Sequence, residues 1–163
     1  MSSNPTHITA PDGTPFIEVV REFDAPRNLV FWASTDPDLV ARWLGPRELT
    51  MHVIEYDVRP GGRYRYVQTA PDGSEYAFHG VFHTVTEPLT IQTFEFEGAP
   101  GSVSLESTAL EDVGGRTRMH HNAVFPSVAA RDQAISAGME HGINDSMDRL
   151  GELLGSGAVR PGR

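Results

Sequence analysis

The sequence predicts an α+β fold in which a curved antiparallel sheet of about six or seven strands packs around one long C-terminal helix. Residues 127–154 contain no proline and repeat large apolar residues at helical spacing. Residues 48–125 instead alternate apolar and polar side chains with a period of two, between short turns rich in glycine and proline. Short connections favour antiparallel neighbours, so the strands are expected to form one sheet whose inner face the helix covers.

The long C-terminal helix is the element on which this prediction depends most. Its large apolar residues recur every three or four positions and would line one face: Ile135, Met139, Ile143, Met147, Leu150 and Leu154. At ~1.5 Å per residue, a single helix over 127–154, with Ser127 as N-cap, would be about 40 Å long. Gly138 and Gly142 lie inside it. A glycine within a helix lowers its stability by about 1 kcal/mol relative to alanine, so the presence of both needs an explanation.

Two short helices are predicted between the first strand, at residues 16–23, and the rest of the sheet. The first helix follows the Asp-Ala-Pro sequence at 24–26, because proline is tolerated in the first turn of a helix. The second begins after Asp36, the expected N-cap, with Pro37 at the first helical position, and it stops at the Gly-Pro sequence 45–46.

A single domain is expected over residues 16–154. Residues 1–15 are polar and contain several prolines, so they are expected to form a flexible arm. The tail, residues 155–163, is rich in glycine and is expected to be disordered. The other strands of the sheet are expected at residues 49–58, 63–69, 75–86, 90–97, 103–110 and 116–125.

Composition excludes several kinds of chemistry. The chain contains no cysteine, and all 13 of its basic residues are arginine. Thiol nucleophiles, zinc–thiolate sites and Schiff-base catalysis are therefore excluded, and no cofactor is predicted. The formal net charge is −9 without a basic cluster, which argues against binding to nucleic acid or to anionic membrane. Arginine without lysine suggests a GC-rich bacterial genome.

The sequence also carries no targeting signal of a secreted or membrane protein. No apolar run approaches the ~20 residues that span a bilayer. The N-terminal residues lack the basic and apolar segments of a signal peptide, so a cytoplasmic location is expected. The absence of cysteine fits a reducing compartment.

Several motifs resemble one known family. Residues 21–46, REFDAPRNLVFWASTDPDLVARWLGP, are similar to the N-terminal signature of the AHSA-type branch of the START/SRPBCC superfamily. Residues 125–154 resemble its C-terminal helix with the Gly-Met-x-x-Gly signature. The resemblance covers residues 16–154, and between these ends it includes the motifs DVRPGG at 57–62, Asp-Gly at 72–73, His-Gly at 79–80 and Gly-Arg-Thr at 115–117.

The resemblance implies a helix-grip fold, in which a strongly bent antiparallel sheet wraps the C-terminal helix and encloses a hydrophobic cavity. The superfamily uses this cavity to hold lipids, sterols, plant hormones or polyketides, and sometimes to cyclise or dehydrate them. The AHSA branch takes its name from a eukaryotic activator of the heat-shock-protein-90 ATPase.

A ligand cavity is expected between the sheet and the C-terminal helix. The two helix glycines would make room there, and the tyrosines would offer buried hydroxyl groups that need a partner. The alternative for each residue is an ordinary role in the core, as ring packing, helix-on-sheet contact or close helix packing. The residues expected to line the cavity are Trp43, Tyr64, Tyr66, Phe82, Phe94, His121, Gly138, Met139, Gly142 and Ile143.

The histidines do not predict a metal site. His79 and His83 share a strand face but would lie about 13 Å apart, too far to bind one ion, and no H-E-x-x-H motif occurs. His121 is expected to face inward, either as an ordinary core histidine or as an acid–base partner of Tyr64 or Tyr66.

Three functions from different classes follow. The preferred hypothesis is a binding or carrier protein for a hydrophobic small molecule, such as a lipid or a polyketide-like compound, and not an enzyme. The second is an enzyme of the cyclase or dehydratase type that uses His121 and the tyrosines. The third is a partner of a chaperone ATPase. The first is preferred because a glycine-containing helix would face strands rich in tyrosine and phenylalanine.

Overall fold

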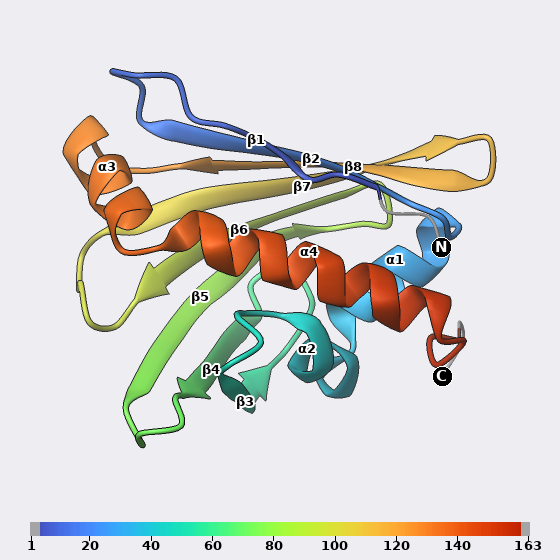
Figure 1. Cartoon of the computed structure of the whole chain (residues 1–163), viewed down its shortest axis with the longest axis horizontal. Helices are drawn as coiled ribbons and strands as arrows, with labels where there is room; N and C mark the ends of the chain where they lie inside the picture. Colours follow the sequence, from blue (N-terminus) through green and yellow to red (C-terminus); the bar gives the residue numbers. More distant parts are fainter. Residues whose placement is uncertain (1–3, 161–163) are drawn as a thin grey trace.

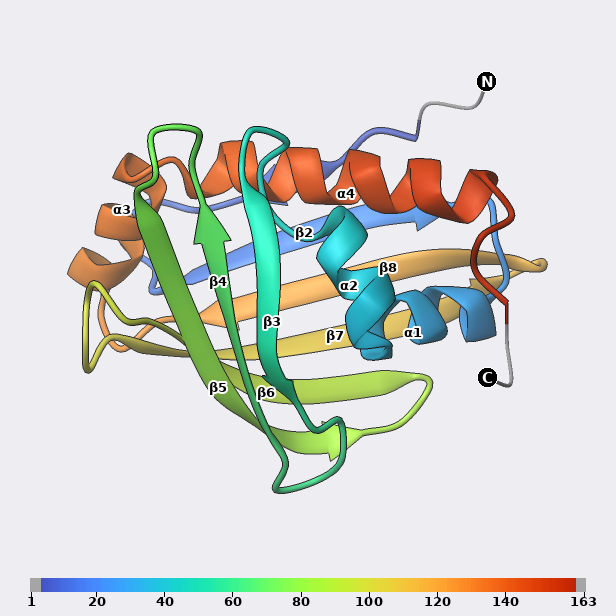
Figure 2. The same ribbon diagram turned by 90° about the horizontal axis from the view of Figure 1, so that it is seen from below.

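A computed structural model describes residues 4–160, which form an antiparallel sheet and four helices (Figure 1). The sheet has eight strands in the order β1-β2-β8-β7-β6-β5-β4-β3. In Figure 2, β2, β7 and β8 run lengthwise along the C-terminal helix, whereas β3, β4 and β5 cross that direction, so the sheet is strongly bent. The predicted α+β class, with a curved antiparallel sheet and a C-terminal helix, is confirmed.

The strands lie close to the predicted ranges, because their alternation of apolar and polar residues matches the pleat. Irregular register between Val53 and Glu55 and between Phe82 and Thr84 accompanies the bending of the sheet. The strands are β1 (His7–Thr9), β2 (Phe16–Phe23), β3 (Thr50–Tyr56), β4 (Arg63–Thr69), β5 (Glu75–Val85), β6 (Leu89–Phe96), β7 (Val103–Val113) and β8 (Arg116–Val124).

The two short helices begin after the predicted start signals, and the second ends just before the predicted Gly-Pro stop. They are α1 (Arg27–Thr35) and α2 (Pro37–Trp43). The carboxylate of Asp36 accepts hydrogen bonds from the backbone amides of Asp38 and Leu39, which makes it the N-cap of α2. Pro37 occupies the first turn, where the missing amide hydrogen costs nothing.

The prediction of one uninterrupted helix over residues 127–154 is wrong, although a C-terminal helix is present. The structure has two helices, α3 (Val128–Ser136) and α4 (Met139–Gly155), separated at Gly138. Gly138 adopts a φ of 95°, a left-handed conformation that interrupts a helix and favours glycine. At ~1.5 Å per residue, α4 is about 25 Å long, and it carries most of the predicted apolar stripe. Ser127 is confirmed as an N-cap, because its hydroxyl accepts from the amide of Ala130.

Both ends of the described chain contribute to the fold. β1 lies within the segment expected to be a flexible arm, and it pairs with β2. Val159, in the segment expected to be a disordered tail, is 5% exposed and packs in the core. The domain limits at residues 16 and 154 remain a proposal. Within residues 4–160, no helix is both long enough and apolar enough to cross a membrane.

The apolar core consists of two clusters. The first joins α1, α2 and α4 to one end of the sheet, and its fully buried members include Val30, Ala33 and Leu150. The second is aromatic and lies where β4 and β5 cross the rest of the sheet, around Tyr64, Tyr66 and Phe82. Strands β6 and β7 lie between these two parts of the sheet, and the inward-facing residues of those strands are partly polar.

Candidate ligand site on the concave face of the sheet

Polar side chains project from the middle strands towards the inside of the bent sheet. Leu110 of β7 belongs to the helical core cluster, so Glu106 and Thr108, at even spacing from it, point to the same face. Across the sheet, Glu106 lies opposite Gln92 of β6 and Ala123 of β8. A carboxyl group therefore lies on the concave face, between the two apolar clusters.

His121 is the nearest titratable neighbour of this carboxyl group. Its Nε2 lies 3.8 Å from Oε1 of Glu106, and its Nδ1 lies 2.9 Å from the hydroxyl of Thr108. The side chain of Glu106 is only 13% exposed and that of His121 is 25% exposed. Burial raises the pKa of Glu106, while His121 and a hydrogen bond with Ser104 oppose this shift. Glu106 therefore holds a proton more readily than an exposed glutamate does.

Aromatic rings form the wall next to the carboxyl group. The ring centroids of Tyr64 and Tyr66 are 6.1 Å apart, and stacking continues from Tyr66 to Phe78 at 5.4 Å and from Phe78 to Phe94 at 5.3 Å. Gly80 allows the Tyr64 ring to lie against β5, because a Cβ at this position would approach the ring and hydroxyl to 2.6 Å.

The two tyrosine hydroxyl groups differ in their partners. Tyr64 donates a hydrogen bond to the backbone oxygen of Thr93 at 2.5 Å. Tyr66 is 5% exposed, yet its hydroxyl forms no hydrogen bond with any residue that the structure describes. Burial raises the pKa of both tyrosines, and negative charge on Glu106 raises them further. Both hydroxyl groups therefore stay protonated at neutral pH, and that of Tyr66 is available to a ligand or to water.

The concave face is only partly covered by the helices. Every residue of β6 is half-buried, including the inward-facing Gln92 and Phe94. Two hollows found among residues 4–160 lie elsewhere, one of about 240 Å³ beside Arg21 and an open one of about 550 Å³ beside Arg131. The enclosed cavity between sheet and helix therefore stays a prediction. We use the name concave-face site for Tyr64, Tyr66, Gln92, Glu106 and His121.

The structure brings half of the predicted lining residues to this face and separates the others from it. Trp43 is buried among the helices, and its indole nitrogen donates to the backbone oxygen of Ala33 at 2.8 Å. Its role is therefore that of a core residue with a satisfied donor. The predicted residues on the concave face are Tyr64, Tyr66, Phe82, Phe94 and His121.

The predicted lining residues of the C-terminal helix lie at different places. Gly138 is exposed at the helix break, and Met139 next to it is half-buried. Ile143 packs against the helical core cluster. Gly142 lies beside Pro46, whose Cγ would be 3.7 Å from an added Cβ, so this glycine faces the loop after α2. Neither glycine is next to the residues of the concave-face site.

Sequence reasoning missed Glu106, which is central to the site. The available signal was its even spacing from Leu110 within a strand, which places a carboxyl group on the apolar face. Reasoning also missed a group that could hold a metal ion, away from the concave face: Glu48, His141 and Asp145. Its signal was the spacing of His141 and Asp145, which lie one helical turn apart.

Comparison with known proteins agrees with the fold. Residues 24–155 match the family described as Activator of Hsp90 ATPase homolog 1-like protein. No curated protein matches the chain.

Solved structures share the architecture over most of the chain. Protein Ms6760 of Mycobacterium smegmatis is 25% identical, with a TM-score of 0.84 over 92% of this chain and 97% of that one. A protein of Arthrobacter aurescens is 25% identical, with a TM-score of 0.86 over 94% of this chain and 93% of that one. DynU16, from the dynemicin biosynthetic locus, shares the fold at 22% identity and a TM-score of 0.69, over 90% of this chain and 49% of that one. The chain therefore belongs to the Activator of Hsp90 ATPase homolog 1-like family, the AHSA-type branch of the START/SRPBCC superfamily.

Proposed function

We propose that this protein binds a hydrophobic, aromatic small molecule on the concave face of its sheet. The observation that carries the proposal is the hydroxyl of Tyr66, which has no partner among the described residues, is still reachable from solvent, and lies on an otherwise buried side chain in an aromatic wall near Glu106. An apolar surface with a few converging polar groups is the usual form of a small-molecule site. A ligand that offers a hydrogen-bonding group would satisfy these side chains.

The chemistry of the site favours one kind of ligand. Stacked rings from Tyr66, Phe78 and Phe94 suit a flat aromatic skeleton. The carboxylate of Glu106 would repel an anion and accept a hydrogen bond from a hydroxyl group or an amine. The proposed ligand class is therefore a neutral or cationic aromatic compound with a donor group, and phenolic polyketide-like compounds belong to it.

A pair of simple probes tests the proposal. 2-Naphthol has an aromatic skeleton with a hydroxyl group, and naphthalene has the same skeleton without it. Fluorescence titration is expected to show saturable binding of both, with 2-naphthol about tenfold tighter, because one hydrogen bond to a charged group contributes about 1.5 kcal/mol or more. The substitutions Tyr66→Phe and Glu106→Gln should reduce this preference.

Glu18→Gln serves as the control, because Glu18 is exposed on the opposite face of β2. It should leave both affinities unchanged. Failure of both probes to bind saturably would refute the proposed function. Equal binding of both probes by the unmodified protein and by the Tyr66→Phe variant would refute the assigned role of the polar groups.

A second candidate function is proton transfer in a cyclase or dehydratase reaction. It is favoured by the contact between Glu106 and His121 and by the raised pKa of Glu106, which makes its carboxylate a stronger base than that of an exposed glutamate. The probe is 2-tetralone, whose protons next to the carbonyl exchange with D₂O. Proton NMR is expected to show faster exchange with the protein than in buffer, and the gain should be lost in Glu106→Gln. An unchanged rate would contradict catalysis.

A further inference from the structure

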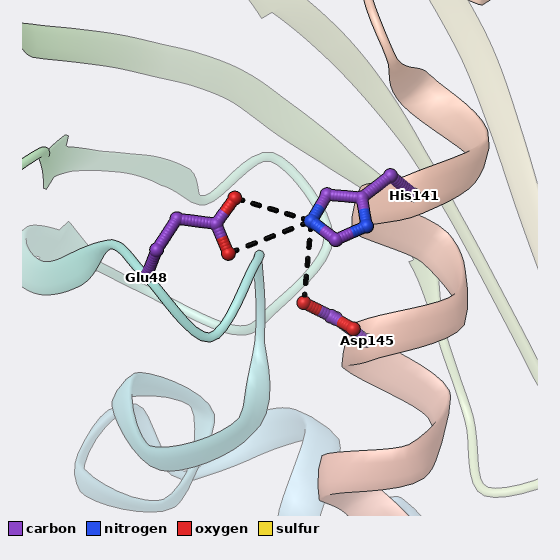
Figure 3. Close-up of side chains that lie close together, drawn as sticks. All are labelled: Glu48, His141 and Asp145. Atoms are coloured by element: carbon purple, nitrogen blue, oxygen red, sulfur yellow. Dashed lines mark hydrogen bonds and ion pairs between the residues drawn. The ribbon is translucent and has the colours of Figure 1, made fainter.

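Three side chains that can bind metal converge where the loop after α2 meets α4 (Figure 3). His141 and Asp145 lie one turn apart on α4, and Glu48 lies between α2 and β3. Nε2 of His141 is 3.1 Å from Oε1 of Glu48 and 3.5 Å from Oδ2 of Asp145. The three ligand atoms all lie within 4.8 Å of one another.

These separations fit the coordination sphere of a small divalent ion. Bonds of about 2.0–2.1 Å in tetrahedral geometry place neighbouring ligand atoms about 3.3 Å apart. The two distances from Nε2 lie on either side of this value. A neutral imidazole has only one N–H group, so it can donate to only one of the two carboxylates at a time. A cation at this position would bind all three groups at once.

The ligand set is held in place by contacts outside it. The backbone amide of Gly45 donates to the hydroxyl of Ser146 at 2.7 Å, and Arg149 donates to the backbone oxygen of Gly45 at 2.9 Å. The backbone amide of Arg47 donates to Oδ2 of Asp145 at 3.0 Å, and this orients the carboxylate as a second-shell group does in metal sites. The segment that carries Glu48 is therefore fixed to α4 before any ion arrives, and less ordering is needed on binding.

We propose that Glu48, His141 and Asp145 form a binding site for one divalent first-row transition-metal ion of the Zn²⁺ type. Imidazole nitrogen together with carboxylate oxygen favours such ions over Mg²⁺ and Ca²⁺, which prefer oxygen ligands alone. His141 is 59% exposed and Glu48 is 54% exposed, so the ion enters from solvent and keeps water at its open positions. The bound ion would link the loop after α2 to α4.

Isothermal titration calorimetry with ZnCl₂ tests the site in the full-length protein. The expected result is one Zn²⁺ per chain, with affinity at least about tenfold weaker in His141→Gln and in Glu48→Gln. Because the side chains of His141 and Glu48 are more than half exposed, these variants should fold normally, and the unfolding temperature without metal checks this. His52→Gln, at an exposed position of β3, is the control for binding to surface histidines and should retain full affinity.

A second measurement separates metal binding from an ordinary ion pair. Long-range ¹H–¹⁵N NMR of the histidine rings should show Zn²⁺ shifting Nε2 of His141 while the ring of His52 stays unchanged. An unfolding temperature that rises with Zn²⁺ in the wild type and not in His141→Gln would support the site. Absence of binding at submillimolar Zn²⁺, or equal binding by His141→Gln, would overturn the proposed metal site. The contacts of His141 with Glu48 and Asp145 would then be ordinary ion pairs.

Discussion

At the residue scale, the contrast between two stacked tyrosines identifies the groups that a ligand could use. Tyr64 and Tyr66 lie on the same face of β4, and both are almost completely buried. Only Tyr64 has a hydrogen-bond acceptor within the described protein, the backbone oxygen of Thr93. The hydroxyl of Tyr66 is not among the fully buried unpaired atoms of the described residues, so it is reachable by water or by a ligand.

The corresponding phenylalanine variants should differ in stability. Tyr64→Phe removes a hydrogen bond and leaves a buried acceptor, so the free energy of unfolding should fall by about 1 kcal/mol. Tyr66→Phe removes no hydrogen bond within the described residues, and it should change that free energy by well under about 1 kcal/mol. Urea denaturation measures both. An equally large loss in Tyr66→Phe would show that its hydroxyl has a partner inside the protein.

The buried carboxyl group predicts a pH dependence of stability. The pKa of Glu106 is raised above 4.5 in the folded protein, so the unfolded chain loses its proton first as the pH rises. The contribution of Glu106 is therefore fully present below about pH 4.5 and is lost as the pH rises through the folded pKa. Each unit by which the pKa is raised corresponds to about 1.4 kcal/mol.

The Glu106→Gln variant cannot lose a proton at this position, so it should not lose stability there as the pH rises. The stability of the variant relative to the wild type should therefore increase from about pH 4.5 upward and then level off. Urea denaturation between about pH 4 and pH 8 measures the difference. Glu18→Gln, at an exposed position of the outer face, is the matched control for removal of one negative charge. A difference between wild type and Glu106→Gln that does not change with pH would contradict the burial of this group.

At the scale of elements, the C-terminal helix shows where pattern reading fails. The apolar spacing from Ile135 to Leu154 is helical throughout, and both α3 and α4 are indeed helices. The break depends on backbone conformation at one residue, Gly138, which hydrophobic periodicity does not report. In the sequence, the cost of Gly138 inside a helix is consistent with room for a ligand or with close helix packing, whereas in the structure this glycine ends a helix.

Substitution by alanine distinguishes the two helix glycines. Gly138→Ala places a Cβ at a φ of 95°, so the free energy of unfolding should fall by about 1–2 kcal/mol. Gly142→Ala adds a methyl group at ordinary contact distance from Pro46 within α4, so that free energy should rise by up to about 1 kcal/mol. Thermal and urea denaturation measure both changes. An unchanged or raised free energy of unfolding in Gly138→Ala would contradict the assigned helix break.

At the scale of the whole molecule, strand alternation was sufficient to predict seven of the eight strands, because one face of each strand must be buried. The short edge strand β1 was missed, because it lies in a polar segment with several prolines. Which residues make up the two sites was harder to predict, because this depends on which parts of the chain become neighbours in the fold. Glu106 meets His121 through the pairing of β7 with β8, and Glu48 meets His141 across 93 residues of sequence. Such contacts follow from tertiary packing and leave no local pattern in the chain.

The central claim is that the concave face binds a small aromatic molecule. Titration of ¹⁵N-labelled protein with 2-naphthol, followed through its backbone amide signals, tests this most directly. The account predicts saturable shifts concentrated in β4 around Tyr66, in β6 around Gln92 and in β7 and β8 around Glu106 and His121. Shifts confined to the outer face of the sheet or to the hollows beside Arg21 and Arg131, or no saturable shift at all, would contradict it.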